Sequence, residues 1–325
     1  MMKTTSYDID PIFIVGVGRS GTTMLVNLLG CHPLLSPIYE TSFLRNMLLL
    51  CEWASWYWGH SLSRSAASVL FGYPRSRFVE KCKKFQQKGI QFRQIVGSKP
   101  GPESKPARGK QKYETFPFTG KQLLFPLDAL IEESEALSKA LQARPLKEEE
   151  IYALARSSVD RLFGMHCARA TKPYWVNKTP RLLLCLELLP KLYPSAKCIH
   201  IVRDGRDVAT SFRTLTWGPK DVREAARRWR GRLEKRKYVD RTRLSYMELR
   251  YEDLIDSPAR SLKAILDFLS IEGDPELMLS QFGVYNHRVG VWRDVFDLEN
   301  RRAFDREAGN LLIELGYEKD RSWVG

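Results

Sequence analysis

The sequence predicts an α/β fold with a central, mostly parallel sheet, and two observations carry this prediction. Short apolar runs are each followed by a turn or by a helical pattern, which is typical of strands in parallel sheets. The first such unit, "IFIVGVGRSGTT" at residues 12–23, is separated from the remaining strands by a long stretch of chain. We therefore expect a single domain of 325 residues with an inserted helical lobe at about residues 50–170.

Each element is predicted from its local pattern. Strands are expected at residues 12–17, 174–177, 198–203 and 244–250. Helices are expected at residues 22–29, 121–142, 148–170, 181–189, 207–215, 259–269 and 302–315. Ser257, which precedes a proline, is expected to cap the 259–269 helix. The segment "CHPLLSPIYE" at residues 31–40 carries two prolines and shows no clear strand pattern.

Composition bears on the compartment and on the ligand. No apolar run reaches the roughly 18 residues that span a bilayer, and the N-terminal residues lack a signal-peptide pattern. The six cysteines contain no C-x-x-C pair, so we expect reduced thiols in a cytoplasmic protein, with a lumenal or secreted protein as the alternative, and no metal site. The net charge of +14 favours an anionic ligand, and much of the excess lies at residues 81–112 and 222–243.

The glycine-rich turn after the first strand fits two templates in part. Its glycines form the G-x-G-x-x-G of a dinucleotide-binding turn, and the same letters match a P-loop in which Thr22 replaces the lysine. The dinucleotide template also needs a second strand soon after the helix, and residues 31–40 show none. Because Arg19 enters the turn, the chemistry favours a phosphate or sulfate held by backbone amides, hydroxyls and an arginine, without a required metal.

A second segment narrows the choice of ligand. "CIHIVRDGRDVATSF", residues 198–212, predicts a strand, a polar turn and the start of a helix. Arg203 ends the strand and Ser211 follows it by eight residues, so both side chains can converge on one phosphate. Asp207 is expected to cap the helix, because a carboxylate beside a phosphate would repel it.

Together these segments resemble the sulfotransferase family. "GVGRSGTTMLVNLLGCHP" is similar to the family's 5′-phosphosulfate-binding loop, and "IHIVRDGRDVATS" is similar to its 3′-phosphate-binding motif. The resemblance implies a three-layer α/β/α fold like that of P-loop NTPases. It also implies 3′-phosphoadenosine 5′-phosphosulfate as the donor, adenosine 3′,5′-bisphosphate as its product, and no metal. It covers the sheet and the C-terminal half well, and residues 50–170 hardly at all.

The resemblance implies binding roles for individual residues. The loop residues expected to hold the 5′-phosphosulfate are Gly18, Arg19, Ser20, Gly21, Thr22 and Thr23. Arg203 and Ser211 would hold the 3′-phosphate. Tyr251 matches a tyrosine that the family often places beside the adenine or a phosphate. "HRVGVWRDVF" resembles the loop that closes over the nucleotide, which brings in Arg288 and Trp292, although it departs from the family's glycine- and lysine-rich form.

Three residues are expected to act in catalysis. "HPLLSPIYETSF" resembles the segment in tyrosylprotein sulfotransferases and their bacterial relatives where a glutamate, 21 positions after the loop arginine, deprotonates the acceptor. Glu40 follows Arg19 by 21 positions, and the resemblance therefore implies that it is the general base. Alternatively, its negative charge caps and stabilises the N-terminus of a helix that starts near Ser42. "VNKTP" resembles the "NK-x-P" of the same branch, so Lys178, with Arg19, would neutralise charge on the bridging oxygen.

The expected function is sulfuryl transfer to a hydroxyl acceptor, and two alternatives remain open. The acceptor is a tyrosine of an acidic peptide, a carbohydrate, a lipid or a small metabolite, and no nucleic-acid-binding motif is present. A P-loop kinase or NTPase would instead use Mg·ATP. A non-enzymatic polyanion-binding protein would use the positive charge directly.

Overall fold

The structure, a computed structural model, describes part of the chain, namely residues 9–39, 42–61, 80, 82–84, 127–215, 218–284 and 288–325. The chain forms two compact units. The first unit comprises Met1–Pro37, Val176–Glu187 and Ser195–Gly325, and the second comprises Ile38–Trp175 and Leu188–Pro194. The stretch for which the sequence predicts a helical lobe, residues 50–170, therefore belongs to the second unit.

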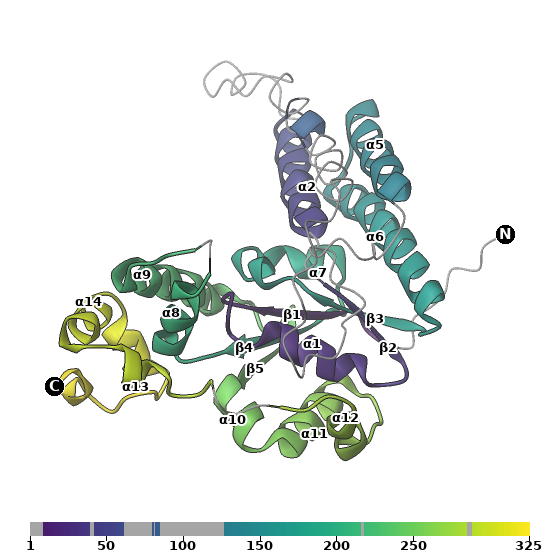
Figure 1. Ribbon diagram of the computed structural model, residues 1–325. Helices are drawn as coiled ribbons and strands as arrows, with labels where there is room; N and C mark the ends of the chain where they lie inside the picture. The colour runs from purple at the N-terminus through teal and green to yellow at the C-terminus, as the bar shows by residue number, and fades with distance from the viewer. Residues whose placement is uncertain are drawn as a thin grey trace, which may run out of the picture. The chain divides into compact units, whose positions relative to one another are not determined.

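The described residues form a five-stranded sheet with the strand order β2-β3-β1-β4-β5 (Figure 1). Its strands are β1 (Ile12–Gly16), β2 (Leu35–Ile38), β3 (Tyr174–Lys178), β4 (Lys197–Val202) and β5 (Ser245–Arg250). β1 pairs in parallel with β3 and with β4, and β4 pairs in parallel with β5. All residues of β1 are buried, as expected for a central strand covered on both faces. The predicted α/β class is confirmed.

The strand β2 was not predicted from the sequence. It contains Pro37, which lacks a backbone N–H and is tolerated only where no ladder hydrogen bond is needed. The strand order explains why the sheet accepts it, since β2 lies at an edge. β2 neighbours β3 rather than β1, whereas the second strand of a dinucleotide-binding fold neighbours the first. The dinucleotide template therefore fails on strand order rather than on a missing strand.

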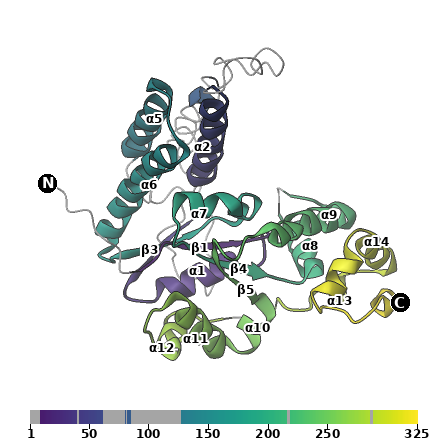
Figure 2. The same cartoon turned by 180° about the vertical axis from the view of Figure 1, so that it is seen from behind.

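Helices of the first unit surround the sheet. They are α1 (Thr22–Gly30), α8 (Gly205–Arg213), α9 (Val222–Leu233), α10 (Tyr251–Asp256), α11 (Pro258–Leu269), α12 (Pro275–Gln281), α13 (Trp292–Val295) and α14 (Leu298–Glu314). Short 3₁₀ helices are η1 (Pro180–Leu184), η3 (Glu234–Tyr238) and η4 (Ser322–Val324). Figures 1 and 2 both show α1 and α10–α12 on one side of the sheet. α9 packs against both α8 and α14.

Of two local predictions for this region, the helix at residues 181–189 was wrong and the N-cap of α11 was right in position. The helix expected at residues 181–189 is replaced by η1, a second 3₁₀ helix η2 (Leu186–Leu188) and the short α7 (Leu189–Leu192). Pro180 and Pro190 each stand in the first turn of a short helix, which fits the missing proline N–H, and Pro190 would have interrupted a longer one. Ser257 is the N-cap of α11 and Pro258 stands in its first turn, as predicted, although the Ser257 side chain accepts no capping hydrogen bond from the described residues.

Most described residues of the second unit are helical. Its longer helices are α2 (Ser42–Ser61), α5 (Leu127–Ala143) and α6 (Glu148–Ala170). α6 has the predicted bounds and packs against α2, α5 and α7. α5 starts at Leu127, and the earlier part of the predicted 121–142 helix lies outside the described residues.

Two further expectations concern the state of the cysteines and the presence of a membrane-spanning helix. All six cysteines lie in the described ranges as thiols outside any disulfide, and five of them are buried. Burial raises the pKa of Cys82 to about 12 and that of Cys167 to about 11, which keeps these thiols protonated. Within the described part of the chain, no helix combines the length and the apolar character needed to span a bilayer.

Candidate functional site

The residues predicted to bind the donor gather along one edge of the sheet. The glycine-rich loop (residues 17–21) follows β1, Lys178 ends β3, Arg203 follows β4 and Tyr251 follows β5. These four strands are parallel neighbours, so their carboxyl ends line this edge in the order Lys178, glycine-rich loop, Arg203, Tyr251. Open α/β sheets bind their ligands outside this edge.

The glycine-rich loop presents backbone amides at the start of α1. The Ser20 N–H donates to the Val17 carbonyl oxygen at 3.1 Å and closes the turn. Arg19 and Gly21 have φ angles of 76° and 89°, in the left-handed region that is costly for any residue but glycine. No side chain of the described residues caps the first turn of α1, so the N–H groups of this turn can donate to an anion. The Ser20 hydroxyl is buried and has no hydrogen-bond partner among the described residues.

Two glycines allow the loop to fit between its neighbours. A Cβ on Gly16 would lie 2.7 Å from the carbonyl oxygen of Ile201 on β4. A Cβ on Gly21 would lie 2.4 Å from the ring of Tyr251. Both distances are too short for a real contact, so glycine is required at both positions. Glycine is thus needed at Gly16 for close packing on β4, and at Gly21 both for close packing on Tyr251 and for the positive φ.

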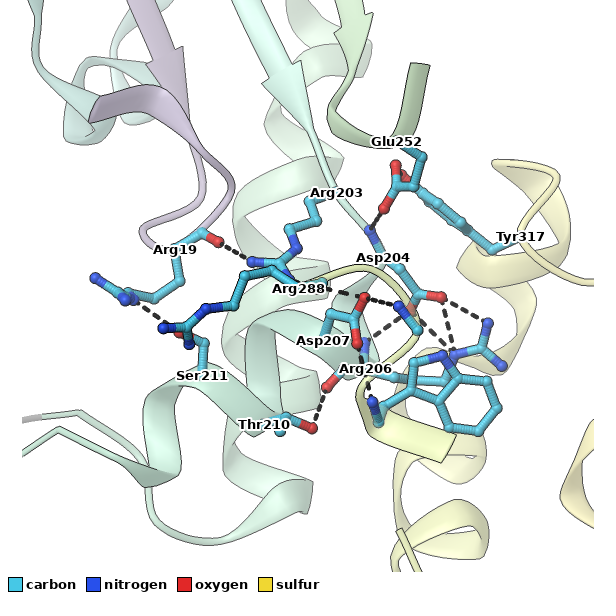
Figure 3. Close-up of polar contacts among 12 residues, drawn as sticks. Arg19, Arg203, Asp204, Arg206, Asp207, Thr210, Ser211, Glu252, Arg288 and Tyr317 are labelled. Atoms are coloured by element: carbon cyan, nitrogen blue, oxygen red, sulfur yellow. Dashed lines mark hydrogen bonds and ion pairs between the residues drawn. The ribbon is translucent and has the colours of Figure 1, made fainter. Parts of the chain in front are cut away.

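Arg203 joins three parts of the site, as Figure 3 shows. Its Nη1 donates to the Arg19 carbonyl oxygen at 3.0 Å, and its Nη2 donates to the Arg288 carbonyl oxygen. Nε of Arg19 donates to Oγ of Ser211 at 2.9 Å. Nε of Arg203 is buried without a partner in the described part of the chain. In Figure 3 the side chains of Arg19 and Arg288 point toward Ser211. The residues predicted for the two ends of the donor therefore form one cluster.

The ring of Tyr251 packs against the guanidinium of Arg203 in this cluster, and its hydroxyl is neutral. The guanidinium of Arg203 is 4.5 Å from the centroid of the Tyr251 ring, in cation–π contact. Burial raises the pKa of Tyr251, although the positive charges of Arg203 and Arg288 oppose the rise. Tyr251 is 5% exposed, and its ring also covers Gly21. Tyr251 thus supports both the glycine-rich loop and Arg203.

The cap of α8 is not the predicted residue. Asp204, not Asp207, is its N-cap, and the Asp204 carboxylate accepts a hydrogen bond from the Arg206 N–H at 2.9 Å. The sequence predicts a helix start at residue 207, two residues later than Gly205, where α8 begins, and Asp207 was therefore expected to be the cap.

Asp207 instead holds the segment that carries Arg288. Its carboxylate accepts hydrogen bonds from the backbone N–H groups of Gly290 at 2.8 Å and Trp292 at 3.0 Å. It also pairs with Arg203 at 3.7 Å. Burial raises the pKa of Asp207, and these hydrogen bonds and the charge of Arg203 work in the opposite direction. A buried carboxylate therefore fixes residues 288–292 against α8.

Trp292 is enclosed by other side chains. Its indole is 4% exposed, with the Arg206 guanidinium 3.8 Å from its ring centroid and Trp323 at 5.7 Å. Arg206 in turn pairs with Asp204 at 2.7 Å and with Glu318. Contact between Trp292 and the nucleotide stays a prediction.

Lys178 is buried at the end of β3, between two polar residues to which the sequence assigns no role. It is 2% exposed and is aligned with Ile14 of β1. The amide of Asn177 and the hydroxyl of Thr179 are buried and have no hydrogen-bond partner among the described residues. Buried polar groups without partners are costly, which suggests a ligand that supplies them. Their signal in the sequence is their position on either side of the lysine in "VNKTP".

Glu40 and Gly18 are the remaining residues predicted for the site. Glu40, the predicted general base, lies outside the described residues. Gly18 is described, and the side chains of Arg232 and Phe212 lie nearest to it. The cluster as a whole brings Arg19, Arg203 and Arg288 around the Ser211 hydroxyl, with loop amides beside them, and can bind more than one anionic group.

A known protein family matches most of this chain. Residues 11–76 and 92–275 match the model of the sulfotransferase family. A curated relative, nodulation protein NoeE from Sinorhizobium fredii, is 27% identical over 51% of this chain and 50% of its own length. The chain thus spans about half the length of that relative.

Two solved structures are similar over nearly the whole chain. The sulfotransferase domain from the curacin biosynthetic pathway is 20% identical, with a TM-score of 0.45, and covers 95% of this chain and 98% of that one. The sulfotransferase domain of the Synechococcus PCC 7002 olefin synthase is 19% identical, with a TM-score of 0.42 and the same two coverages. The matched residues include the glycine-rich loop and the Arg203 segment, both described above. The chain belongs to the sulfotransferase family.

Proposed function

We propose that this chain transfers a sulfuryl group from 3′-phosphoadenosine 5′-phosphosulfate to a hydroxyl group of an acceptor. One observation carries the proposal: Arg203 hydrogen-bonds the backbone of Arg19 while the Arg19 side chain hydrogen-bonds Ser211. A loop suited to a 5′-phosphosulfate and a pair suited to a 3′-phosphate therefore meet at one place. A donor with anionic groups at both ends fits this arrangement better than a nucleotide with a single phosphate chain.

The residues present fit such a donor. The loop amides and the partnerless hydroxyl of Ser20 offer hydrogen bonds to the 5′-phosphosulfate. The partnerless Nε of Arg203, the Ser211 hydroxyl and Arg288 offer charge-assisted hydrogen bonds to the 3′-phosphate. Tyr251 contributes a buried ring beside both groups.

The chemistry proceeds by in-line displacement at sulfur. The donor supplies an activated sulfuryl group: the acceptor oxygen forms a bond to sulfur as the bond from sulfur to the bridging phosphate oxygen breaks. Adenosine 3′,5′-bisphosphate leaves with that bridging oxygen, and Glu40 takes the proton of the acceptor hydroxyl. Lys178, Arg19 and the loop amides stabilise the negative charge that develops on the leaving group.

A kinase or NTPase and a polyanion-binding protein fit the site less well. Thr22 occupies the position of the P-loop lysine and its side chain is 4% exposed, so no ammonium group is placed there. The basic surface of α9 is partly neutralised by ion pairs of Arg227 with Glu307 at 3.0 Å and of Arg228 with Glu224 at 2.9 Å. A non-specific binder would gain from leaving such charges unpaired.

Donor turnover tests the proposal. The protein is incubated with the donor and one hydroxyl compound of each class, namely a tyrosine peptide, a saccharide, a hydroxylated lipid and a phenolic metabolite. Chromatography measures the bisphosphate released, and mass spectrometry detects the sulfated product. We expect Glu40→Gln to lower kcat by about 10²–10⁴-fold and Lys178→Met by about 10²–10³-fold. Glu187→Gln, at an exposed position of η2, is the matched control. Hydrolysis of Mg·ATP with no use of the sulfuryl donor would contradict the proposal.

A further inference from the structure

One arginine of α9 lacks the acidic partner that its neighbours have. Arg227 and Arg228 pair with carboxylates, as described above, and Arg230 lies 3.9 Å from Glu234. The side chain of Arg232 is partly buried and forms no ion pair or hydrogen bond with any residue that the structure describes. A partly buried cation without a counter-ion is unfavourable unless a ligand supplies the negative charge.

Arg232 lies against the glycine-rich loop. A Cβ on Gly18 would be 3.9 Å from Nη1 of Arg232 and 3.9 Å from the ring of Phe212. The helix that carries Arg232 is firmly placed, because the buried indole of Trp229 donates from Nε1 to the Arg203 carbonyl oxygen at 3.1 Å. Gly205 packs so tightly on Trp229 that a Cβ there would lie 2.4 Å from the indole. Arg232 follows Trp229 by three residues and so shares its side of the helix.

Two more guanidinium groups lie near Arg232. Arg228 is one helical turn earlier, on the same face of α9, with its guanidinium 5.9 Å from the centroid of the Phe212 ring. Arg181 belongs to η1, which contacts α9, and it is exposed. Burial and the like charges of Arg228 and Arg181 lower the pKa of Arg232, so the cluster repels itself in the absence of an anion.

Along the sheet edge, Arg181 lies on the other side of the glycine-rich loop from Arg203 and Tyr251, the residues predicted to bind the nucleotide. Arg203 and Tyr251 follow β4 and β5, on one side of the glycine-rich loop. Arg181 follows Lys178 at the end of β3, on the other side of the loop. An anion bound by Arg181 would thus lie on the β3 side of the glycine-rich loop, away from Arg203 and Tyr251.

We propose that Arg232 and Arg181 bind an anionic group of the acceptor, so that the preferred acceptor is a hydroxyl compound that already carries a negative charge near its reacting hydroxyl. This inference rests on the proposed function and names its substrate class. Arg232 is the main contact, and Arg181, more exposed, is the second. Arg228 is held by Glu224 and adds positive potential without direct contact.

Matched pairs of acceptors test the inference without turnover. Wild-type protein saturated with adenosine 3′,5′-bisphosphate is titrated calorimetrically with a tyrosine peptide flanked by glutamates and with its counterpart flanked by glutamines. Methyl glucuronide and methyl glucoside form a second pair. We expect the anionic member of at least one pair to bind about tenfold more tightly or better, the size of one charge-assisted hydrogen bond. Arg232→Met should bring the two affinities together, and Arg181→Met should do so in part.

The control and the unfolding temperature distinguish binding from a structural role. Arg227→Met removes a charge from the same helix, at a side chain paired with Glu307, and should leave the discrimination intact. Arg232→Met should keep or raise Tm, because it removes an uncompensated charge, whereas a structural arginine would lower Tm when replaced.

Each other outcome overturns the inference. Equal affinities of the wild type for both members of both pairs would show that no acceptor anion is recognised. A loss of bisphosphate affinity in Arg232→Met as large as the loss of acceptor affinity would assign Arg232 to the donor. If the bisphosphate fails to bind wild-type protein at all, the proposed function falls together with the inference. If it binds well and only the acceptor discrimination is missing, the inference alone falls.

Discussion

The guanidinium of Arg203 donates to the backbone carbonyl oxygen of Arg19 at 3.0 Å, linking the strand β4 to the loop that follows β1. Arg19 has a φ of 76°, and this hydrogen bond helps to hold its carbonyl group in that unusual conformation. Arg203 thus has two functions. It holds the glycine-rich loop through the Arg19 carbonyl oxygen, and its Nε, which has no partner among the described residues, can donate to an anion. Loop geometry and anion binding are therefore coupled through one side chain.

Replacing Ser211 tests the predicted 3′-phosphate contact. Ser211→Ala removes a hydroxyl that can donate to the phosphate and that accepts from Arg19 at 2.9 Å. We expect adenosine 3′,5′-bisphosphate to bind about tenfold more weakly, and ADP, which has no 3′-phosphate, to bind as before. Thr210→Val on the same helix is the control, because its hydroxyl donates to the Arg206 carbonyl oxygen within α8. An equal loss for both nucleotides would place Ser211 elsewhere than at the 3′-phosphate.

Replacing Gly21 tests the packing of the loop on Tyr251. Gly21→Ala forces a Cβ to within 2.4 Å of the Tyr251 ring at a φ of 89°. We expect a loss of about 1–3 kcal/mol in the free energy of unfolding from the backbone conformation alone, together with loss of bisphosphate binding. Adding Tyr251→Ala to this variant should recover part of the stability, because the clash disappears while the strained φ remains. Urea unfolding of the two single variants and the double variant measures this, and strictly additive losses would argue against the contact.

Replacing Asp207 should loosen the segment that carries Arg288. In Asp207→Asn the amide has one oxygen to accept from the N–H groups of Gly290 and Trp292, where the carboxylate has two. We expect a destabilisation of about 1–3 kcal/mol and faster hydrogen exchange at these two amides. Asp294→Asn, at an exposed position of the same segment, should change neither quantity. Unchanged exchange at Gly290 and Trp292 in Asp207→Asn would show that other contacts fix the segment.

His200 should make the protein less stable in mild acid. Its ring is buried between β4 and β5, with Nδ1 at 2.5 Å from Oη of Tyr246. Burial, with the positive charges of Arg236 and Arg241, lowers the pKa of His200 to about 3. The unfolded chain has a histidine pKa of about 6.5 and takes up a proton below that pH, while the folded chain does not. Stability contributed by this group is therefore complete above pH 6.5 and is lost progressively as the pH falls toward 3.

The His200→Asn variant isolates this effect, since Asn places a polar atom near Nδ1 and does not titrate. The slope of the unfolding free energy against pH between 6 and 4 should be smaller in the variant, by up to about 1.4 kcal/mol per pH unit. Urea unfolding at several pH values gives the slope for both proteins. Identical slopes would mean that His200 is protonated in the folded state.

The sequence predicted the centre of the fold because two segments combine an apolar strand pattern with residues suited to binding an anion. The glycine-rich loop and the Arg203 segment each combine a buried strand, a turn and a helix start, and both lie where parallel strands end. Strand β2 was missed because Pro37 is unfavourable in a general strand, and only the sheet order shows that it lies at an edge. The short helices η1, η2 and α7 were merged into one because an apolar run hid the effect of Pro190.

Within the site, the sequence predicted residue types better than their partners. Asp207 was expected to cap α8, yet its contacts lie more than 80 residues away, at Gly290 and Trp292, and no local pattern reveals such contacts. In the sequence, Arg232 is one of many basic residues in the stretch 222–243. Its missing counter-ion and its contact with Gly18 emerge only from tertiary structure.

The central claim is that the edge of the sheet binds a 3′-phosphorylated adenosine donor without a metal. Calorimetric titration with adenosine 3′,5′-bisphosphate and with ADP, each with and without Mg²⁺, tests it directly on wild-type protein and on Arg203→Ala. We expect the bisphosphate to bind without Mg²⁺ at least about tenfold more tightly than ADP, and Arg203→Ala to lose most of this preference. Binding of ADP with Mg²⁺ as tightly as the bisphosphate, or more tightly, would contradict the claim and favour a kinase.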